Sequence, residues 1–211
     1  MRLLHRLVLT TGAMCAAFAL AVVPASANPS TTWTATPNPA NISAVVSGYT
    51  TLTAGTPLVC TQSTMQGSMY SAVGNPATVA TFNGLSFGTS VSPCQTALGI
   101  ATFVPSAPWH FVAVDYNPAT GVASGYLADV YLRISEGISC VFTTAGKASA
   151  TYRNSTGVLS VNSVPGELAV TSVTSGCGTT VTTATLPTFR GNYIIRISGT
   201  TTAPTLVGSN P

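Results

Sequence analysis

The segment Gly84-Leu85-Ser86-Phe87-Gly88 matches G-x-S-x-G, the motif that carries the nucleophilic serine of α/β hydrolases. Acyl transfer at that serine would need a histidine as general base and a carboxylate to orient the histidine. His110 and Asp115 follow, but the order Ser, His, Asp differs from the Ser, Asp, His order of that fold. The flanking residues also read as strands rather than as strand, turn and helix. A secreted hydrolase acting through Ser86 and His110 is therefore our third hypothesis for the function.

The other acidic residues form no pattern that predicts catalysis or metal binding. Asp129, Glu136 and Glu167 stand singly in the sequence, whereas a glycosidase needs two carboxylates facing one scissile bond. Calcium sites need clustered oxygen ligands, and structural zinc sites need close pairs such as C-x-x-C; the sequence has neither. We therefore expect no catalytic residues, no metal site and no cofactor.

Four cysteines follow the first 27 residues: Cys60, Cys94, Cys140 and Cys177. An even number of cysteines in an exported chain predicts two disulfides, and four cysteines allow three pairings. The first two and the last two are separated by similar lengths of chain, which favours Cys60–Cys94 and Cys140–Cys177. Each closed loop should stabilise the fold by roughly 3–4 kcal/mol through the entropy that it removes from the unfolded chain.

Aromatic side chains are the best candidates for a binding surface, because an exposed ring can pack against a sugar or a partner protein. Most of them are expected in the core. The candidate surface consists of Trp33, Trp109 and Tyr131, and Tyr131 should be the best exposed because strand alternation places it opposite the core face. The platform could draw on a wider set: Trp33, Tyr49, Tyr70, Trp109, Tyr116, Tyr131 and Tyr193.

The elements that must position these residues read as short strands. The clearest alternation runs over residues 126–134, and a period of two over nine residues predicts a half-buried strand. Its even-numbered side chains should be buried, with Asp129, Tyr131 and Arg133 on the other face. The Asn83-Gly84 dipeptide signals a hairpin or a bulge.

Residues 140–177 read as an antiparallel meander with a cysteine at each end. Gly, Asn and Pro clusters predict turns within it, and β-branched residues predict the strands between the turns. Two further strands are expected at residues 179–186 and 191–198. Residues from Gly199 onward should be loosely held. The predicted turns of the meander are residues 145–147, 153–157 and 162–166.

These patterns predict an all-β fold: an antiparallel β-sandwich of about a dozen short strands, held by two disulfides, in a single domain spanning residues 28–211. Residues 1–27 should be a signal-peptide helix, with a basic start, an apolar run and an A-x-A cleavage site at Ala25-Ser26-Ala27. The apolar run is short for a membrane span, and cleavage after Ala27 would remove it. The predicted localisation is secreted, without membrane association after cleavage.

Charge is scarce, at 5% of residues against about 25% in an ordinary domain. Of the seven Lys and Arg residues, Arg2 and Arg6 leave with the signal peptide, so five remain against four Asp and Glu. Such a weak net charge gives no reason to expect nucleic acid or an anionic membrane as a partner. Few charges also leave strand edges unprotected, so self-association is expected to be a liability.

Four short segments, in this order and spacing, resemble a group of secreted actinobacterial β-rich proteins with paired cysteines, for which no activity is known. The resemblance implies export, a β-rich domain and paired cysteines, and no particular activity. The segments are residues 58–63 with Gly67, Pro108-Trp109, Tyr152-Arg153-Asn154 leading to Leu159, and Cys177-Gly178 followed by Gly191-Asn192-Tyr193.

The sequence thus favours a secreted, non-catalytic structural or interaction protein of the cell envelope or the extracellular space. The alternative is a carbohydrate- or protein-binding module that uses exposed aromatic residues. The expected partners are a cell-wall glycan or another exported protein.

Overall fold

The computed structural model describes residues 30–209. The predicted signal peptide, residues 1–27, lies outside the described residues. Within the described part, no helix has the length and apolar character needed to cross a membrane.

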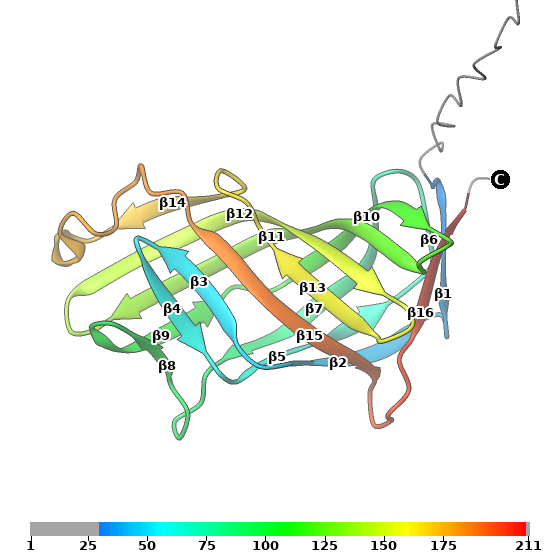
Figure 1. Ribbon diagram of the computed structural model, residues 1–211, viewed down its shortest axis with the longest axis horizontal. Helices are drawn as coiled ribbons and strands as arrows, with labels where there is room; N and C mark the ends of the chain where they lie inside the picture. Colours follow the sequence, from blue (N-terminus) through cyan, green and yellow to red (C-terminus); the bar gives the residue numbers. More distant parts are fainter. Residues whose placement is uncertain (1–29, 210–211) are drawn as a thin grey trace, which may run out of the picture.

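The described chain is built from sixteen strands and a single turn of 3-10 helix (Figure 1). Most strands are short, but β11 and β12 run for 15 and 14 residues. The elements are β1 (Thr32–Thr36), β2 (Ala40–Val46), β3 (Thr50–Ala54), β4 (Thr56–Cys60), β5 (Ser63–Met69), β6 (Ala72–Val73), β7 (Ala77–Phe87), β8 (Cys94–Thr96), β9 (Gly99–Pro105), β10 (Trp109–Asn117), β11 (Val122–Glu136), β12 (Cys140–Arg153), β13 (Val158–Asn162), β14 (Leu168–Val173), η1 (Ser175–Cys177), β15 (Thr188–Ile197) and β16 (Thr205–Ser209).

Thirteen strands form one antiparallel sheet in the order β14-β12-β13-β15-β2-β5-β7-β10-β11-β9-β8-β4-β3. Two additional pairings, β11 with β12 and β3 with β15, join strands that are distant in this order. The facing layers are therefore parts of one continuous sheet that closes on itself around the core. A second sheet, β16-β1-β6, covers one end of the elongated body, on the right in Figure 1.

The predicted all-β, antiparallel, disulfide-linked fold is confirmed. Cys60 pairs with Cys94 and Cys140 with Cys177, as their spacing favours. The predicted turns at residues 153–157 and 162–166 both separate strands of the meander.

The predicted turn at residues 145–147 is wrong, because β12 runs straight through Gly146. Gly146 has a φ of +145°, and a Cβ at this position would lie 2.2 Å from the backbone oxygen of Glu167. Glycine is needed here because β14 approaches the β12 backbone closely, not because the chain reverses. Similarly, Asn83-Gly84 lies within β7 at a register shift, so the bulge rather than the hairpin is formed.

The predicted strand over residues 179–186 is also wrong; the segment forms turns. Threonine hydroxyls compete there for backbone groups: the Thr182 amide donates to Thr185 Oγ1 at 2.9 Å, and the Ala184 amide donates to Thr182 Oγ1 at 3.3 Å. Such local bonds favour turns over a sheet ladder.

The end of the described chain is held more tightly than the sequence predicts. Strand β16 pairs with β1 over five residues, and Leu206 is buried. The Asn154 side chain clamps Leu206 by accepting from its amide at 2.8 Å and donating to its carbonyl at 2.9 Å.

In β11 the expected alternation holds for Val130, Leu132 and Ile134, which are buried. It fails before them, because a register shift between Leu127 and Val130 puts Leu127 in the core in place of Tyr126 and Ala128. Asp129 lies in this bulge with a φ of +57°, a conformation that Asp tolerates better than most residues.

Candidate functional site

The predicted binding surface of Trp33, Trp109 and Tyr131 is not formed. Trp33 is 1% exposed and Trp109 is 0% exposed, so neither ring can contact a ligand. Trp109 lies inside an aromatic cluster, with ring centroids 5.8 Å from Phe87 and 5.9 Å from Phe189. Tyr131 is 39% exposed, as strand alternation predicts, but it stands alone of the three on the surface.

The residues considered for a hydrolase are not brought together either. Ser86 lies on β7 five residues from Thr81, which pairs with His110, so Ser86 and His110 are separated by roughly 16 Å. His110 instead lies between Thr81 Oγ1, 3.1 Å from its Nδ1, and Asp129 Oδ2, 3.7 Å from its Nε2. Asp115 pairs with Ser124 on β11. The Thr81, His110 and Asp129 side chains thus link the outer surfaces of β7, β10 and β11.

Metal ligands are sparse in the described chain. Among residues 30–209, no three His, Cys, Asp or Glu side chains lie close enough to hold one ion. His110 Nε2 and Asp129 Oδ2 lie 3.7 Å apart, but they form a pair of possible ligands and not a group of three.

A row of polar side chains crosses the outer face of four strands. The sheet register places Ser124 of β11 opposite Thr151 of β12, Thr151 opposite Ser160 of β13, and Ser160 opposite Asn192 of β15. Directly paired residues project from the same face of a sheet, so the four side chains form one line across the strands. The Asn192 carbonyl accepts a hydrogen bond from the Ser47 amide at 2.7 Å, which extends the line toward β3.

Three hollows follow this row and share residues with one another. The first, of about 430 Å³, and the second, of about 340 Å³, both include Thr151 and Ser160. The second and the third, of about 450 Å³, both include Ser47 and Asn192. We call the three together the polar groove; most of its lining side chains are hydroxyls, amides or cations. The lining comprises Ser47, Tyr49, Thr51, Thr53, Val122, Ser124, Ser149, Thr151, Arg153, Thr156, Val158, Ser160, Asn162, Arg190, Asn192 and Ile194, with Gly48, Gly125, Ala150 and Gly191.

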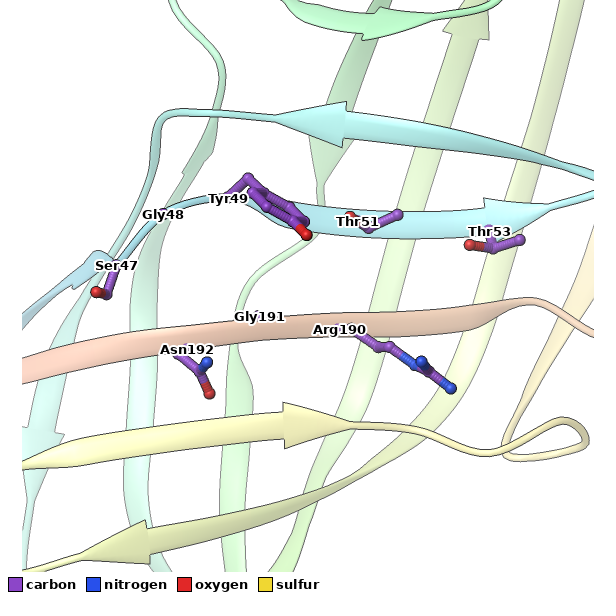
Figure 2. Close-up of a pocket in the computed structure, with 8 residues that line it drawn as sticks. All are labelled: Ser47, Gly48, Tyr49, Thr51, Thr53, Arg190, Gly191 and Asn192. Carbon is purple, nitrogen blue, oxygen red and sulfur yellow. The ribbon is translucent and has the colours of Figure 1, made fainter.

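The third hollow holds the exposed aromatic side chain of the groove. Figure 2 shows Tyr49, Thr51 and Thr53 along one segment, with Arg190 and Asn192 on the neighbouring strand β15. Tyr49 is 62% exposed, so its ring is available to a ligand. Tyr49 belongs to the wider aromatic set found in the sequence, but it lies outside a regular alternation, and no sequence signal distinguishes it.

Buried hydroxyl groups support this hollow from below. The Tyr193 hydroxyl lies 2.7 Å from Thr50 Oγ1 and 3.1 Å from Ser63 Oγ. Burial raises the pKa of Tyr193 to about 12, although both neighbouring hydroxyls act in the opposite direction. Gly191 passes directly over this cluster; a Cβ there would lie 2.7 Å from Thr50 Oγ1. The floor of the groove is therefore neutral and closely packed.

A second buried phenol lies under the middle of the groove. The Tyr152 hydroxyl donates to the Pro204 carbonyl at 2.6 Å. Burial raises the pKa of Tyr152 well above its ordinary value, an effect that the nearby Arg196 charge opposes. Burial thus favours the neutral form of both phenols beneath the groove.

Glu167 lies beside the first hollow, bound to Ser149 of its lining. Its carboxylate accepts from the Ser149 amide at 2.9 Å, the Ser149 hydroxyl at 2.5 Å and the Val164 amide at 3.0 Å. Burial alone would raise the pKa of Glu167, but these hydrogen bonds and the charge of Lys147 outweigh it and hold the pKa below the ordinary 4.5. The carboxylate oxygens are thus already hydrogen-bonded to Ser149 and Val164.

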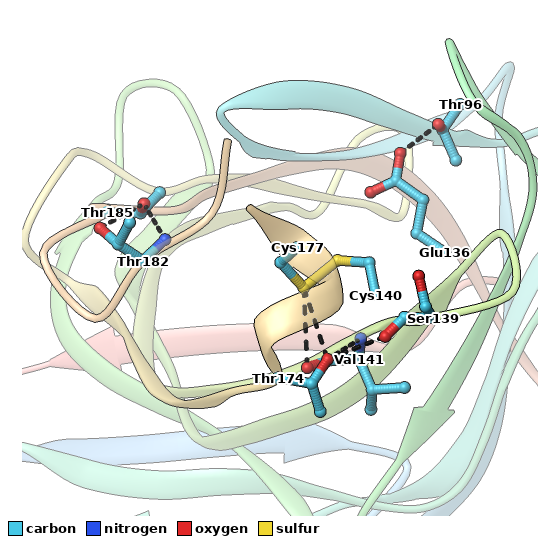
Figure 3. The surroundings of a disulfide bond; sticks show 9 residues. All are labelled: Thr96, Glu136, Ser139, Cys140, Val141, Thr174, Cys177, Thr182 and Thr185. Atoms are coloured by element: carbon cyan, nitrogen blue, oxygen red, sulfur yellow. Dashed lines mark hydrogen bonds between the residues drawn. A yellow bond between two sulfur atoms is a disulfide. The ribbon is translucent and has the colours of Figure 1, made fainter. Parts of the chain in front are cut away.

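The Cys140–Cys177 disulfide anchors the opposite end of β12 (Figure 3). Beside it, Thr174 Oγ1 accepts from the Val141 amide and donates to the Ser139 carbonyl, each at 2.9 Å. The link and the hydroxyl together fasten the 3-10 turn and the end of β14 to the start of β12, the strand that supplies Ser149, Thr151 and Arg153 to the groove.

Comparison of the chain with protein-family models, with curated proteins and with solved structures found no match. The polar row itself carries no sequence signal, since single Ser, Thr and Asn residues on separate strands gain meaning only when the register aligns them. What the aligned row can do is donate and accept many hydrogen bonds to an extended polar ligand.

Proposed function

We propose that the protein is an extracellular, non-catalytic binding protein whose ligand is a carbohydrate chain lying in the polar groove. The observation that carries the proposal is the row of polar side chains that the sheet register aligns, with the exposed Tyr49 beyond the Asn192 end of the row. The row consists of Ser124, Thr151, Ser160 and Asn192. Sugar hydroxyls need closely spaced donors and acceptors, and the apolar face of a sugar ring packs against an aromatic ring. Two disulfides support an oxidising, extracellular location.

The test uses the chain from residue 28 on a glycan array and in a pull-down on isolated cell walls. Exchange of Tyr49 for Ala should weaken binding about tenfold, and exchange of Asn192 for Ala should have a similar effect. Tyr131→Ala is the matched control, because Tyr131 is an exposed tyrosine outside the groove. Equal loss in all three variants, or none in the first two, would contradict the proposal.

An apolar tip supports a second candidate, association between copies of the chain. Leu98 lies in the turn between β8 and β9, Ile138 lies in the turn between β11 and β12, and the neighbouring Gly137 amide donates to the Ile100 carbonyl at 3.3 Å. Exposed apolar residues gathered in this way are typical of contact surfaces. Light scattering should then show a dimer that Ile138→Ser converts to monomer; a wild-type monomer at high concentration would eliminate this candidate. The tip consists of Leu98, Ile100 and Ile138.

A further inference from the structure

The polar groove contains two exposed arginines that are free to bind a ligand. Arg153 lines the second hollow and Arg190 lines the third. Within residues 30–209 neither guanidinium group makes a hydrogen bond or an ion pair. Arg196 behaves differently, since its guanidinium donates to the Thr156 and Ile195 carbonyls. The planar fork of an arginine matches a carboxylate in two parallel hydrogen bonds, so both free groups are suited to anions.

Within residues 30–209, none of the acidic residues forms an ion pair with Arg153 or Arg190. Glu167 is held by Ser149 and Val164, as described above. Glu136 is buried and accepts from the Thr96 hydroxyl, while Asp129 faces His110.

Asp115 also shares the outer face of the polar row. It pairs with Ser124, beyond the β11 end of the row. Lys147 adds a further cation near the first hollow, with its Nζ 5.1 Å from the centre of the Tyr126 ring. The groove is therefore positive near Arg153 and Arg190, whereas Glu167 offsets Lys147 beside the first hollow and Asp115 makes the β10 edge negative.

The spacing of the two arginines sets the length of the ligand. Arg153 pairs with Val158 and Arg190 pairs with Asn162, so they lie two strands apart and four residues apart along β13. Their backbones are thus separated by roughly 16 Å. A single small acid cannot contact both guanidinium groups, whereas a chain with repeated negative groups can.

We propose that the ligand is a linear acidic polysaccharide, with separate carboxylates bound by Arg153 and Arg190 while its hydroxyls bond to the polar row. This inference rests on the proposed function and names the class of carbohydrate. Orientation follows from the charges: the chain runs diagonally over β12, β13 and β15 from Arg153 to Arg190, and its negative groups avoid the edge that holds Asp115.

Calorimetric titration with oligogalacturonate, its neutral methyl ester and an oligomer of glycerol phosphate tests the inference. The carboxylate oligomer should bind tightest, and its affinity should fall steeply between about 50 mM and about 300 mM salt. The double exchange Arg153→Gln and Arg190→Gln should weaken its binding at least about tenfold and leave that of the ester unchanged. Arg133→Gln is the control, an exposed arginine outside the groove. Asp115→Asn should strengthen binding.

The outcomes separate this inference from the proposed function. Equal affinity for the acid and its ester, with both lost in Tyr49→Ala, would overturn the acidic class and retain carbohydrate binding. Tighter binding of the phosphate oligomer would overturn the assignment to carboxylates. Failure of every oligosaccharide and every cell-wall glycan to bind the wild type would overturn both. Arg153→Lys with Arg190→Lys, which keeps the charges, should recover part of the affinity if the variants are folded.

Discussion

The Tyr193 hydroxyl and Thr50 Oγ1 lie 2.7 Å apart in the interior, 143 residues apart in the sequence, directly beneath the groove. Ser63 Oγ completes the cluster at 3.1 Å. Exchange of Tyr193 for Phe would leave the Thr50 and Ser63 hydroxyls buried without the phenol. We expect a loss of about 1–2 kcal/mol in the free energy of unfolding, measured by urea denaturation.

Tyr49→Phe is the control for this change, because Tyr49 is exposed and should alter stability by less than about 0.5 kcal/mol. If Tyr193→Phe were as stable as the control, the buried cluster would not support the groove.

Both disulfides close loops of similar length, with separations of 34 and 37 residues. Replacement of Cys140 and Cys177 by Ser should lower the free energy of unfolding by about 3–4 kcal/mol, because the unfolded chain regains the entropy of the open loop. The Cys60 and Cys94 double variant should lose a similar amount in guanidinium denaturation. A loss much larger in one variant would show that local packing, rather than loop length, dominates.

Gly146 and Gly99 allow backbone conformation to be separated from crowding. Both have positive φ, +145° and +116°, but a Cβ at Gly146 would meet the Glu167 backbone oxygen at 2.2 Å, whereas one at Gly99 would meet nothing within 4 Å. Gly99→Ala should therefore cost about 1 kcal/mol, from conformation alone. Gly146→Ala should cost several times more, since β14 must also move away from β12. Equal melting temperatures for the two variants would contradict the close approach.

Local chemistry in the sequence predicts the fold class well. Cysteine spacing gives both disulfides, and Asn- and Gly-rich turns give the hairpin between β12 and β13. The errors occur where the decisive neighbour is distant in sequence. Gly146 predicts a turn from the sequence, but in the fold it allows the close approach of Glu167. The Thr-rich segment after Cys177 predicts a strand, but its hydroxyls bond to the backbone and favour turns.

The candidate site is harder to predict than the fold. Trp33 and Trp109 have the ring type of a binding platform, but the same apolar area that suits a ligand also favours burial. Ser160 meets Thr151 and Asn192 only through the register of β13 with two other strands. Register depends on the whole sheet, so no window of sequence contains this row.

Glu167 makes the stability of the β12–β14 region depend on pH. Its pKa in the folded protein lies below the ordinary 4.5, because hydrogen bonds from Ser149 and Val164 favour the ionised form. The stabilisation is thus fully present above pH 4.5 and is lost as the pH falls through the folded-state value. Glu167→Gln cannot form the ionised contacts, so it should be less stable than wild type near neutral pH. The difference should shrink as urea denaturation is repeated toward about pH 3. If the difference in stability between Glu167→Gln and wild type did not change with pH, it would arise from lost packing and not from lost charge-assisted hydrogen bonds.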